Sequence, residues 1–272
     1  MASSYYYLIA GLPELNLEQS ARGFDHLALK QYVAAQLSPE DLPLWEAIYL
    51  PYDNRNLLNV LLEQRKPFNP LGKYTQEEVE KMLQEPADAS QYMQHFIEEF
   101  RSAKETKSDA ELTSLALETK LNTLFYAYAE GLNNKFLHRW YSFDRQLRNL
   151  QAALLNRQLK REANFSLVGN DDITEALSKN MSADFGLKGE VDGLEMLMQI
   201  FDHKDVVARE HKLDELRWQM ADEYTAFDYF ALDKVLAYAV KLQLIDRWTN
   251  ITKEAGSKKL QSLLAEIHSS FS

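Results

Sequence analysis

The distribution of proline constrains the fold of this chain more than any other feature of its sequence. All seven prolines lie before residue 87, so the rest of the 272 residues contain none. Proline interrupts helices because it lacks an N–H donor and clashes with the preceding turn. The sequence therefore predicts short elements joined by turns up to residue 86, followed by a long helical body rich in good helix formers.

The longest periodic segment runs from about residue 109 to residue 161. Ser108 and Glu111 form a capping-box pattern at its start, and apolar residues recur at helical spacing on both sides of Gly131. This pattern predicts one very long helix or two helices joined end to end. Across the chain, the periodicity predicts an all-α fold with little or no sheet.

Several shorter elements are also expected. Residues 4–12 are typical of a short strand, with a helix as the alternative. We expect Pro51 to end the helix that begins near Ser38, and Asp53 to cap the helix that follows. Thr75 and Glu78 form a second capping-box pattern. Further helices are predicted at 25–37, 87–102, 172–180, 194–201, 203–223, 227–244 and 258–267.

The composition excludes several classes of protein. The chain has no cysteine, which removes disulfides, thiolate nucleophiles and cysteine metal sites. Its net charge of −11 argues against nucleic-acid binding, which depends on clustered positive charge. No window reaches the roughly 18 apolar residues of a membrane span, and the N-terminus has no signal-peptide pattern. We therefore expect a cytoplasmic protein that does not cross a membrane.

No sequence motif indicates catalysis. A glycine-rich phosphate loop is missing, and no acidic residue stands three places before any of the six histidines, as a helical di-metal site would require. The segment from Asp202 to Asp205 is the most metal-like cluster, and we interpret it as a helix junction with a capping aspartate. No nucleophile has a base beside it. The sequence thus predicts no catalytic residue, metal or cofactor.

A basic stripe follows residue 134 of this acidic chain. Seven cations there are opposed only by Asp144. One interpretation is a solvated face paired with acidic neighbours such as Glu77, Glu78 and Glu80. The other is a contact for an acidic partner protein or for lipid headgroups. On the second interpretation, the predicted partner-binding residues are Lys135, Arg139, Arg145 and Arg148.

A short pattern recurs three times along the chain. It begins at Asn56 (NLLNVLL), Asn149 (NLQAALL) and Asn250 (NITKEAG), so the asparagines are 93 and 101 residues apart. An aspartate precedes each one, namely Asp53, Asp144 and Asp246. Equal spacing predicts three similar helical units, approximately 1–86, 87–180 and 181–272, within one domain. We interpret these polar residues as structural caps and helix-edge contacts.

These segments resemble a known family. Residues 53–66 (DNRNLLNVLLEQRK), 144–157 (DRQLRNLQAALLNR) and 230–251, with the tyrosine-rich start, are similar to the connector family of V-type and archaeal-type ATP synthases, whose members are called C in the archaeal-type enzymes and d in the eukaryotic ones. The chain resembles more closely a small family of uncharacterised bacterial proteins encoded beside V-type ATP synthases. It departs from the connector family in being shorter, and in the wider aspartate–asparagine spacing of the middle copy.

The resemblance implies a three-lobed, funnel-like set of repeated helical bundles. It also implies a non-catalytic subunit that seats the central rotor shaft on the membrane ring, with shaft and ring subunits as partners. Such a protein would be cytoplasmic and attached to the inner membrane through the complex. Two alternatives remain open: a stand-alone helical interaction or assembly protein for the same complex, and a helical enzyme whose site has no sequence motif.

Overall fold

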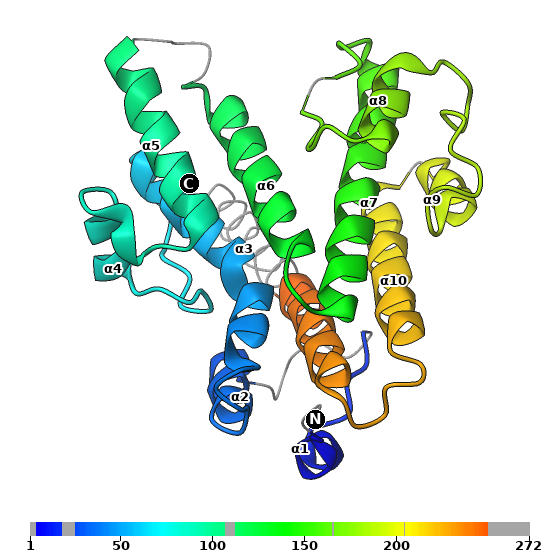
Figure 1. The fold of residues 1–272 in the computed structure, drawn as a ribbon. Helices are drawn as coiled ribbons and strands as arrows, with labels where there is room; N and C mark the ends of the chain where they lie inside the picture. The colour runs from blue at the N-terminus through cyan, green and yellow to red at the C-terminus, as the bar shows by residue number, and fades with distance from the viewer. Residues whose placement is uncertain (1–3, 18–24, 107–111, 165, 204, 250–272) are drawn as a thin grey trace, which may run out of the picture.

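The computed structural model describes residues 4–17, 25–106, 112–164, 166–203 and 205–249, and all the regular structure in these ranges is helical (Figure 1). The predicted all-α fold is confirmed. Residues 232–249, orange in Figure 1, form one further helix, called helix 232–249 below. The other elements are α1 (Tyr6–Gly11), α2 (His26–Ala34), α3 (Leu42–Leu61), α4 (Gln76–Met82), the 3-10 helix η1 (Pro86–Asp88), α5 (Gln91–Thr106), α6 (Ser114–Glu130), α7 (Lys135–Leu159), α8 (Asp172–Lys179), α9 (Leu194–Phe201) and α10 (Val206–Tyr224).

Local capping signals predicted several helix starts correctly. Thr75 and Glu78 form the expected capping box of α4, and Asp205 accepts hydrogen bonds from the first N–H groups of α10. The strand predicted for residues 4–12 is wrong. This segment forms α1, and the N–H of Tyr5 donates to the carbonyl of Phe230, a contact distant in sequence. The predicted cap at 108–111, the third repeat asparagine Asn250 and the helix at 258–267 lie outside the described residues.

The described part of the segment from 109 to 161 forms a helical hairpin and not helices joined end to end. Helix α6 ends at Gly131, and α7 begins after Asn134, whose side chain accepts the N–H of Leu137. The chain reverses direction over residues 131–134, so α6 and α7 lie side by side (Figure 1). Asparagine is a preferred N-cap residue, and the pair Asn133–Asn134 was the local signal for this break.

Helix α3 continues through Pro51, contrary to the prediction that this proline ends a helix. A proline has no N–H, so the carbonyl of Ala47, four residues earlier, loses its helical partner. The hydroxyl of Tyr141 on α7 donates to this carbonyl over 2.9 Å. The side-chain amide of Gln243 on helix 232–249 donates to the adjacent carbonyl of Ile48 over 2.8 Å. Tertiary contacts therefore replace the hydrogen bonding that a proline disrupts.

A buried ionic network joins α6, α7, α10 and helix 232–249. Asp214 is fully buried and accepts hydrogen bonds from Arg217, Arg247 and the indole of Trp248. Arg217 also contacts Asp144 on α7, which accepts the hydroxyl of Tyr126 on α6. Because each buried charge has an opposite charge beside it, the network fixes the relative positions of these helices.

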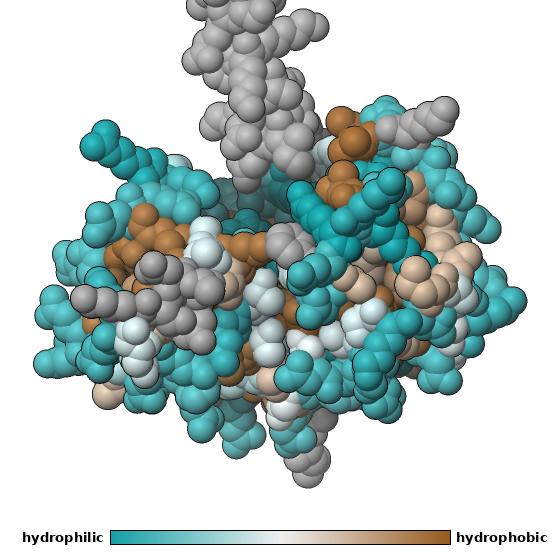
Figure 2. Space-filling view, turned by 90° about the horizontal axis from the view of Figure 1, so that it is seen from above, coloured by the Kyte–Doolittle hydropathy of each residue, from teal (hydrophilic) through white to brown (hydrophobic). Residues whose placement is uncertain are grey.

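The helices diverge away from the end that carries α1. Figure 1 shows α5 and α6 on one side and α7 and α8 on the other, separating toward the top of the view. Figure 2 looks onto that upper end, where apolar residues lie in separate patches among hydrophilic ones. One cluster of buried apolar side chains extends through the chain from Tyr5 to Val240. The division into three lobes stays a prediction.

The role of Tyr141 is testable by a double-mutant cycle. We expect Tyr141→Phe to lower the free energy of unfolding by about 1–2 kcal/mol, because the buried carbonyl of Ala47 loses its donor. In a Pro51→Ala background the loss becomes smaller, since residue 51 then supplies an N–H to that carbonyl. Urea unfolding of the four proteins measures the coupling.

Tyr92→Phe is the matched control for this cycle. Tyr92 is also buried, and its hydroxyl donates to the side-chain oxygen of Asn54 rather than to the backbone carbonyl that the proline leaves without a helical partner. The cost of Tyr92→Phe is expected to be the same in both backgrounds. Equal costs of Tyr141→Phe with and without Pro51 would contradict the proposed compensation.

Candidate functional site

The two repeat asparagines within the described residues make the same contact. Asn56 on α3 is buried, and its side-chain amide binds both the carbonyl and the N–H of Asn69, over 2.9 and 3.0 Å. Asn149 on α7 is buried and binds both backbone groups of Val168 in the same way, over 2.7 and 2.8 Å. We call Asn56 and Asn149 the loop-binding asparagines. Each fastens the loop that links its long helix to a short capped helix, α4 or α8.

A charged residue one turn earlier fastens the end of each loop. Asp53, three places before Asn56, accepts the N–H groups of Lys73 and Tyr74. Arg145, four places before Asn149, pairs with Asp171, the residue that caps α8. The two copies thus use opposite charges for the same purpose. Arg145 takes the place that the repeat pattern assigned to Asp144.

A glycine makes room for the charged side chain in each copy. A Cβ on Gly72 would lie 2.2 Å from the carboxylate of Asp53, and one on Gly169 would lie 3.0 Å from the guanidinium of Arg145. Gly169 also has a φ of +93°, which side-chain-bearing residues rarely adopt. Both copies therefore need a glycine at the point where the loop meets its helix.

The aspartates of the repeat have different surroundings, and none that is described caps a helix. Asp53 lies inside α3, and burial raises its pKa to about 6, although the N–H groups of Lys73 and Tyr74 and the charge of Lys30 oppose the shift. Asp144 lies within α7 and pairs with Arg217. Asp246 lies 3.9 Å from the imidazole of the buried His26. The capping role that we predicted for Asp53 is wrong.

The four predicted partner-binding residues do not form one surface. Lys135 and Arg139 are exposed, and Arg139 packs over the ring of Tyr224 at 4.0 Å. Arg145 is buried between Glu130 and Asp171, so its charge is neutralised inside the chain. Arg148 is partly exposed and contacts Glu118. These acidic neighbours are not the glutamates of α4 that were expected to pair with the basic stripe.

An exposed aromatic cluster lies at the end that carries α1. We call it the aromatic end, and it consists of Tyr6, Tyr7, Tyr229 and Phe230, whose rings are linked by contacts between neighbours. The rings of Tyr6 and Phe230 are 4.8 Å apart between centroids, and the chain segments meet through the Tyr5–Phe230 hydrogen bond. The aromatic end includes two of the three consecutive tyrosines at residues 5–7. Only Tyr5 is buried, so the tyrosine run was the signal for a surface that the sequence did not otherwise reveal.

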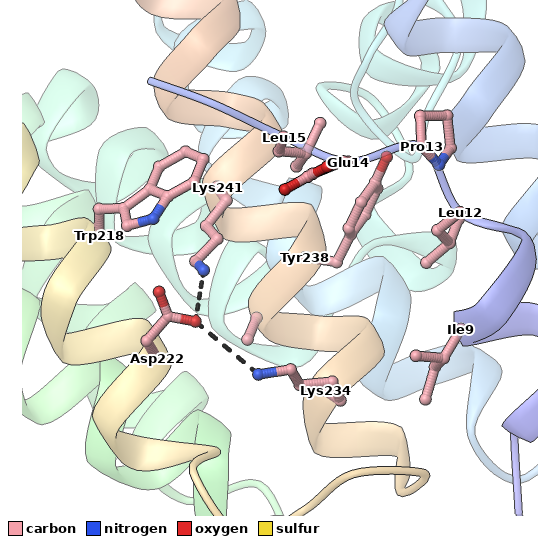
Figure 3. Close-up of a pocket in the computed structure, with 11 residues that line it drawn as sticks. Ile9, Leu12, Pro13, Glu14, Leu15, Trp218, Asp222, Lys234, Tyr238 and Lys241 are labelled. Atoms are coloured by element: carbon pink, nitrogen blue, oxygen red, sulfur yellow. Dashed lines mark hydrogen bonds and ion pairs between the residues drawn. The ribbon is translucent and has the colours of Figure 1, made fainter. Parts of the chain in front are cut away.

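The cavity drawn in Figure 3 lies between the segment after α1, α10 and helix 232–249. It encloses about 240 Å³ and is lined by residues including Leu12, Trp218 and Tyr238. Its two lysines, Lys234 and Lys241, both pair with Asp222. Because these charges are paired and no lining residue is a nucleophile beside a base, the cavity has no evident catalytic chemistry.

Neither a metal site nor a membrane span is found in the described ranges. Within the part of the chain that the structure describes, no group of three or more histidine, aspartate or glutamate side chains is placed to hold a metal ion. In the same ranges, every helix is too short or too polar to span a bilayer. The segment from Asp202 to Asp205, predicted to be a helix junction, contains a helix cap: the side chain of Asp205 accepts hydrogen bonds from N–H groups in the first turn of α10.

Comparison with known proteins gives one match. The model of the family described as "Protein of unknown function (DUF2764)" matches residues 1–270. The chain belongs to this family. No curated protein and no solved structure matches it. The family match covers the first two predicted repeat units and the third up to residue 270.

The loop-binding role of Asn149 gives a first prediction. We expect Asn149→Ala to lower the free energy of unfolding by about 3 kcal/mol, because the buried N–H and carbonyl of Val168 both lose their partner. Asn133→Ala, a change of the same kind at an exposed position, is expected to have little effect. Thermal and urea unfolding measure both variants. Equal stability of the two variants would contradict this role.

The close approach at Gly72 gives a second prediction. We expect Gly72→Ala to destabilise the protein by about 1–3 kcal/mol, since its Cβ would overlap the carboxylate of Asp53 and push the loop away from α3. The control is Gly11→Ala, where the new Cβ meets no atom within 4 Å. Chemical unfolding of the two variants compares them, and a Gly72→Ala protein as stable as the control would show that the loop is not held in this position.

Proposed function

We propose that this protein is a non-catalytic connector subunit of a V-type ion-translocating ATPase or ATP synthase, which couples the central rotor shaft to the membrane ring. Its partners on this proposal are the shaft subunits and the ring subunits. It would lie in the cytoplasm and attach to the membrane through the complex. The proposal rests on the resemblance to the connector family in three segments of the sequence.

The observation that carries the proposal is the equivalence of the two loop-binding asparagines. The resemblance implies internally repeated helical units, and the repeat in the sequence is a short asparagine–leucine pattern. Asn56 and Asn149 each bind the N–H and carbonyl of one loop residue. The same contact at matching positions supports a repeat that is structural as well as sequential.

A connector that transmits torque needs rigid helices and binding surfaces more than a reactive site. The contacts that join the helices suit this requirement. The buried Asp214 binds Arg217 and Arg247, and Tyr141 and Gln243 connect α3 to two other helices. Exposed aromatic side chains at the end that carries α1 supply a surface of the kind found in protein interfaces.

Copurification tests the proposal. The full chain, tagged, is purified from detergent-solubilised membranes of its own host, and the bound proteins are identified by mass spectrometry. We expect stoichiometric recovery of the catalytic head and the membrane-ring subunits. Recovery of this chain alone, from the soluble fraction, would overturn the proposal. Recovery only with partly assembled complexes would identify an assembly protein for the same machine instead.

A further inference from the structure

The aromatic end differs in chemistry from the rest of the surface. Tyr7 is 88% exposed and Tyr229 is 64% exposed, and Tyr6 and Phe230, whose rings link these two, are also exposed. Monomeric proteins rarely leave several large apolar side chains together in water, because covering them is favourable. Such a cluster, rich in tyrosine and phenylalanine, is typical of the centre of a protein interface.

The two segments that form this cluster are firmly attached to the fold. Tyr5, which precedes α1, is buried, and its hydroxyl bonds the carboxylate of Asp41 at the start of α3. The N–H of Tyr5 bonds the carbonyl of Phe230 over 2.8 Å. At the start of the turn formed by residues 225–231, the hydroxyl of Thr225 donates a hydrogen bond to the carbonyl of Ala221 in the last turn of α10. The exposed rings therefore project from held backbone, which lowers the entropy cost of binding.

The charge around the cluster selects the kind of partner. Helix α1 has no charged residue, and Asp228 is the only charged residue in 225–231, between Phe227 and Tyr229 in sequence. Lys234, which follows this turn, already pairs with Asp222. Aromatic faces attract cations, and a carboxylate beside them adds to that attraction. The cluster thus suits aliphatic side chains accompanied by lysine or arginine.

We propose that the aromatic end binds the basic cytoplasmic loops of the membrane-ring subunits. This inference rests on the proposed function, because the ring is a partner only if the chain is the connector. Loops on the cytoplasmic side of membrane proteins carry an excess of lysine and arginine close to the ends of apolar helices. That combination matches exposed rings beside Asp228.

A direct contact with lipid fits the same surface less well. Aromatic side chains do lie at membrane interfaces, but anionic lipid headgroups are bound by clusters of lysine and arginine. The charge within the aromatic end is a carboxylate, and the chain as a whole carries −11. Repulsion between Asp228 and anionic headgroups therefore favours the protein partner.

Binding of the purified full chain to the detergent-solubilised membrane ring of its host tests the inference. Tyr7→Ser/Tyr229→Ser is the main variant, because both side chains are largely exposed and their loss leaves the core intact. We expect it to weaken ring binding at least about tenfold, as loss of interface aromatics does elsewhere. Asp228→Lys is expected to weaken binding as well and to reduce its dependence on salt.

Met181→Ser is the matched control. Met181 is 83% exposed and lies two residues after α8, a helix that Figure 1 shows at the opposite end of the molecule from α1. Its substitution removes an exposed apolar side chain without touching the aromatic end, so ring binding is expected to stay unchanged. Circular dichroism and thermal unfolding of every variant establish that the fold is retained.

The possible outcomes are distinct. If the native chain does not bind the ring, the proposed function fails and this inference fails with it. If the native chain binds the ring and Tyr7→Ser/Tyr229→Ser binds equally well, only this inference is overturned. Loss of binding to the isolated shaft subunits instead of the ring would assign the surface to the shaft. Loss of binding to protein-free vesicles of phosphatidylglycerol and phosphatidylethanolamine would assign it to lipid, and either result overturns the inference.

Discussion

Helix α3 continues through a proline because two other helices supply hydrogen bonds where the proline removes one. Tyr141 on α7 donates to the carbonyl of Ala47, and Gln243 on helix 232–249 donates to that of Ile48. If α3 ended at Pro51, the following turns would leave the helix axis. Asp53 and Asn56 would then no longer point toward the loop before α4. The first repeat therefore depends on contacts from the second and third parts of the chain.

The repeated contact has a simple physical basis. A loop that crosses a helix surface has backbone groups that need partners, and one amide side chain provides a donor and an acceptor together. Asn56 and Asn149 both do this from buried positions. The charged neighbours Asp53 and Arg145 then hold the ends of the loops, and Gly72 and Gly169 let the backbone approach them. Both loops are thereby held to the long helices, which suits a protein that works through rigid surfaces.

The sequence showed which residues recur in the candidate site, but it did not show what surrounds them in the fold. The spacing in the sequence revealed the asparagine repeat. In the second copy, however, the residue that holds the end of the loop is Arg145, and Asp144 pairs with Arg217 instead. The composition revealed the basic stripe, but it did not show that Arg145 is buried or that the guanidinium of Arg139 packs over the ring of Tyr224. The aromatic end was missed because Tyr6 and Phe230 are distant in sequence and meet only in the fold.

The sequence by itself determined the all-α class, the capped starts of α4 and α10 and the positions of the repeated asparagines. These follow from local rules: helical periodicity, capping side chains and the absence of proline after residue 86. Only the tertiary structure decided that Pro51 lies inside a helix, that α6 and α7 form a hairpin, and which charges are buried. Those outcomes depend on hydrogen bonds and ion pairs between residues far apart in the chain, such as Tyr141 with Ala47 and Arg145 with Asp171. Local sequence carries no record of such partners, because they are brought together only when the helices pack.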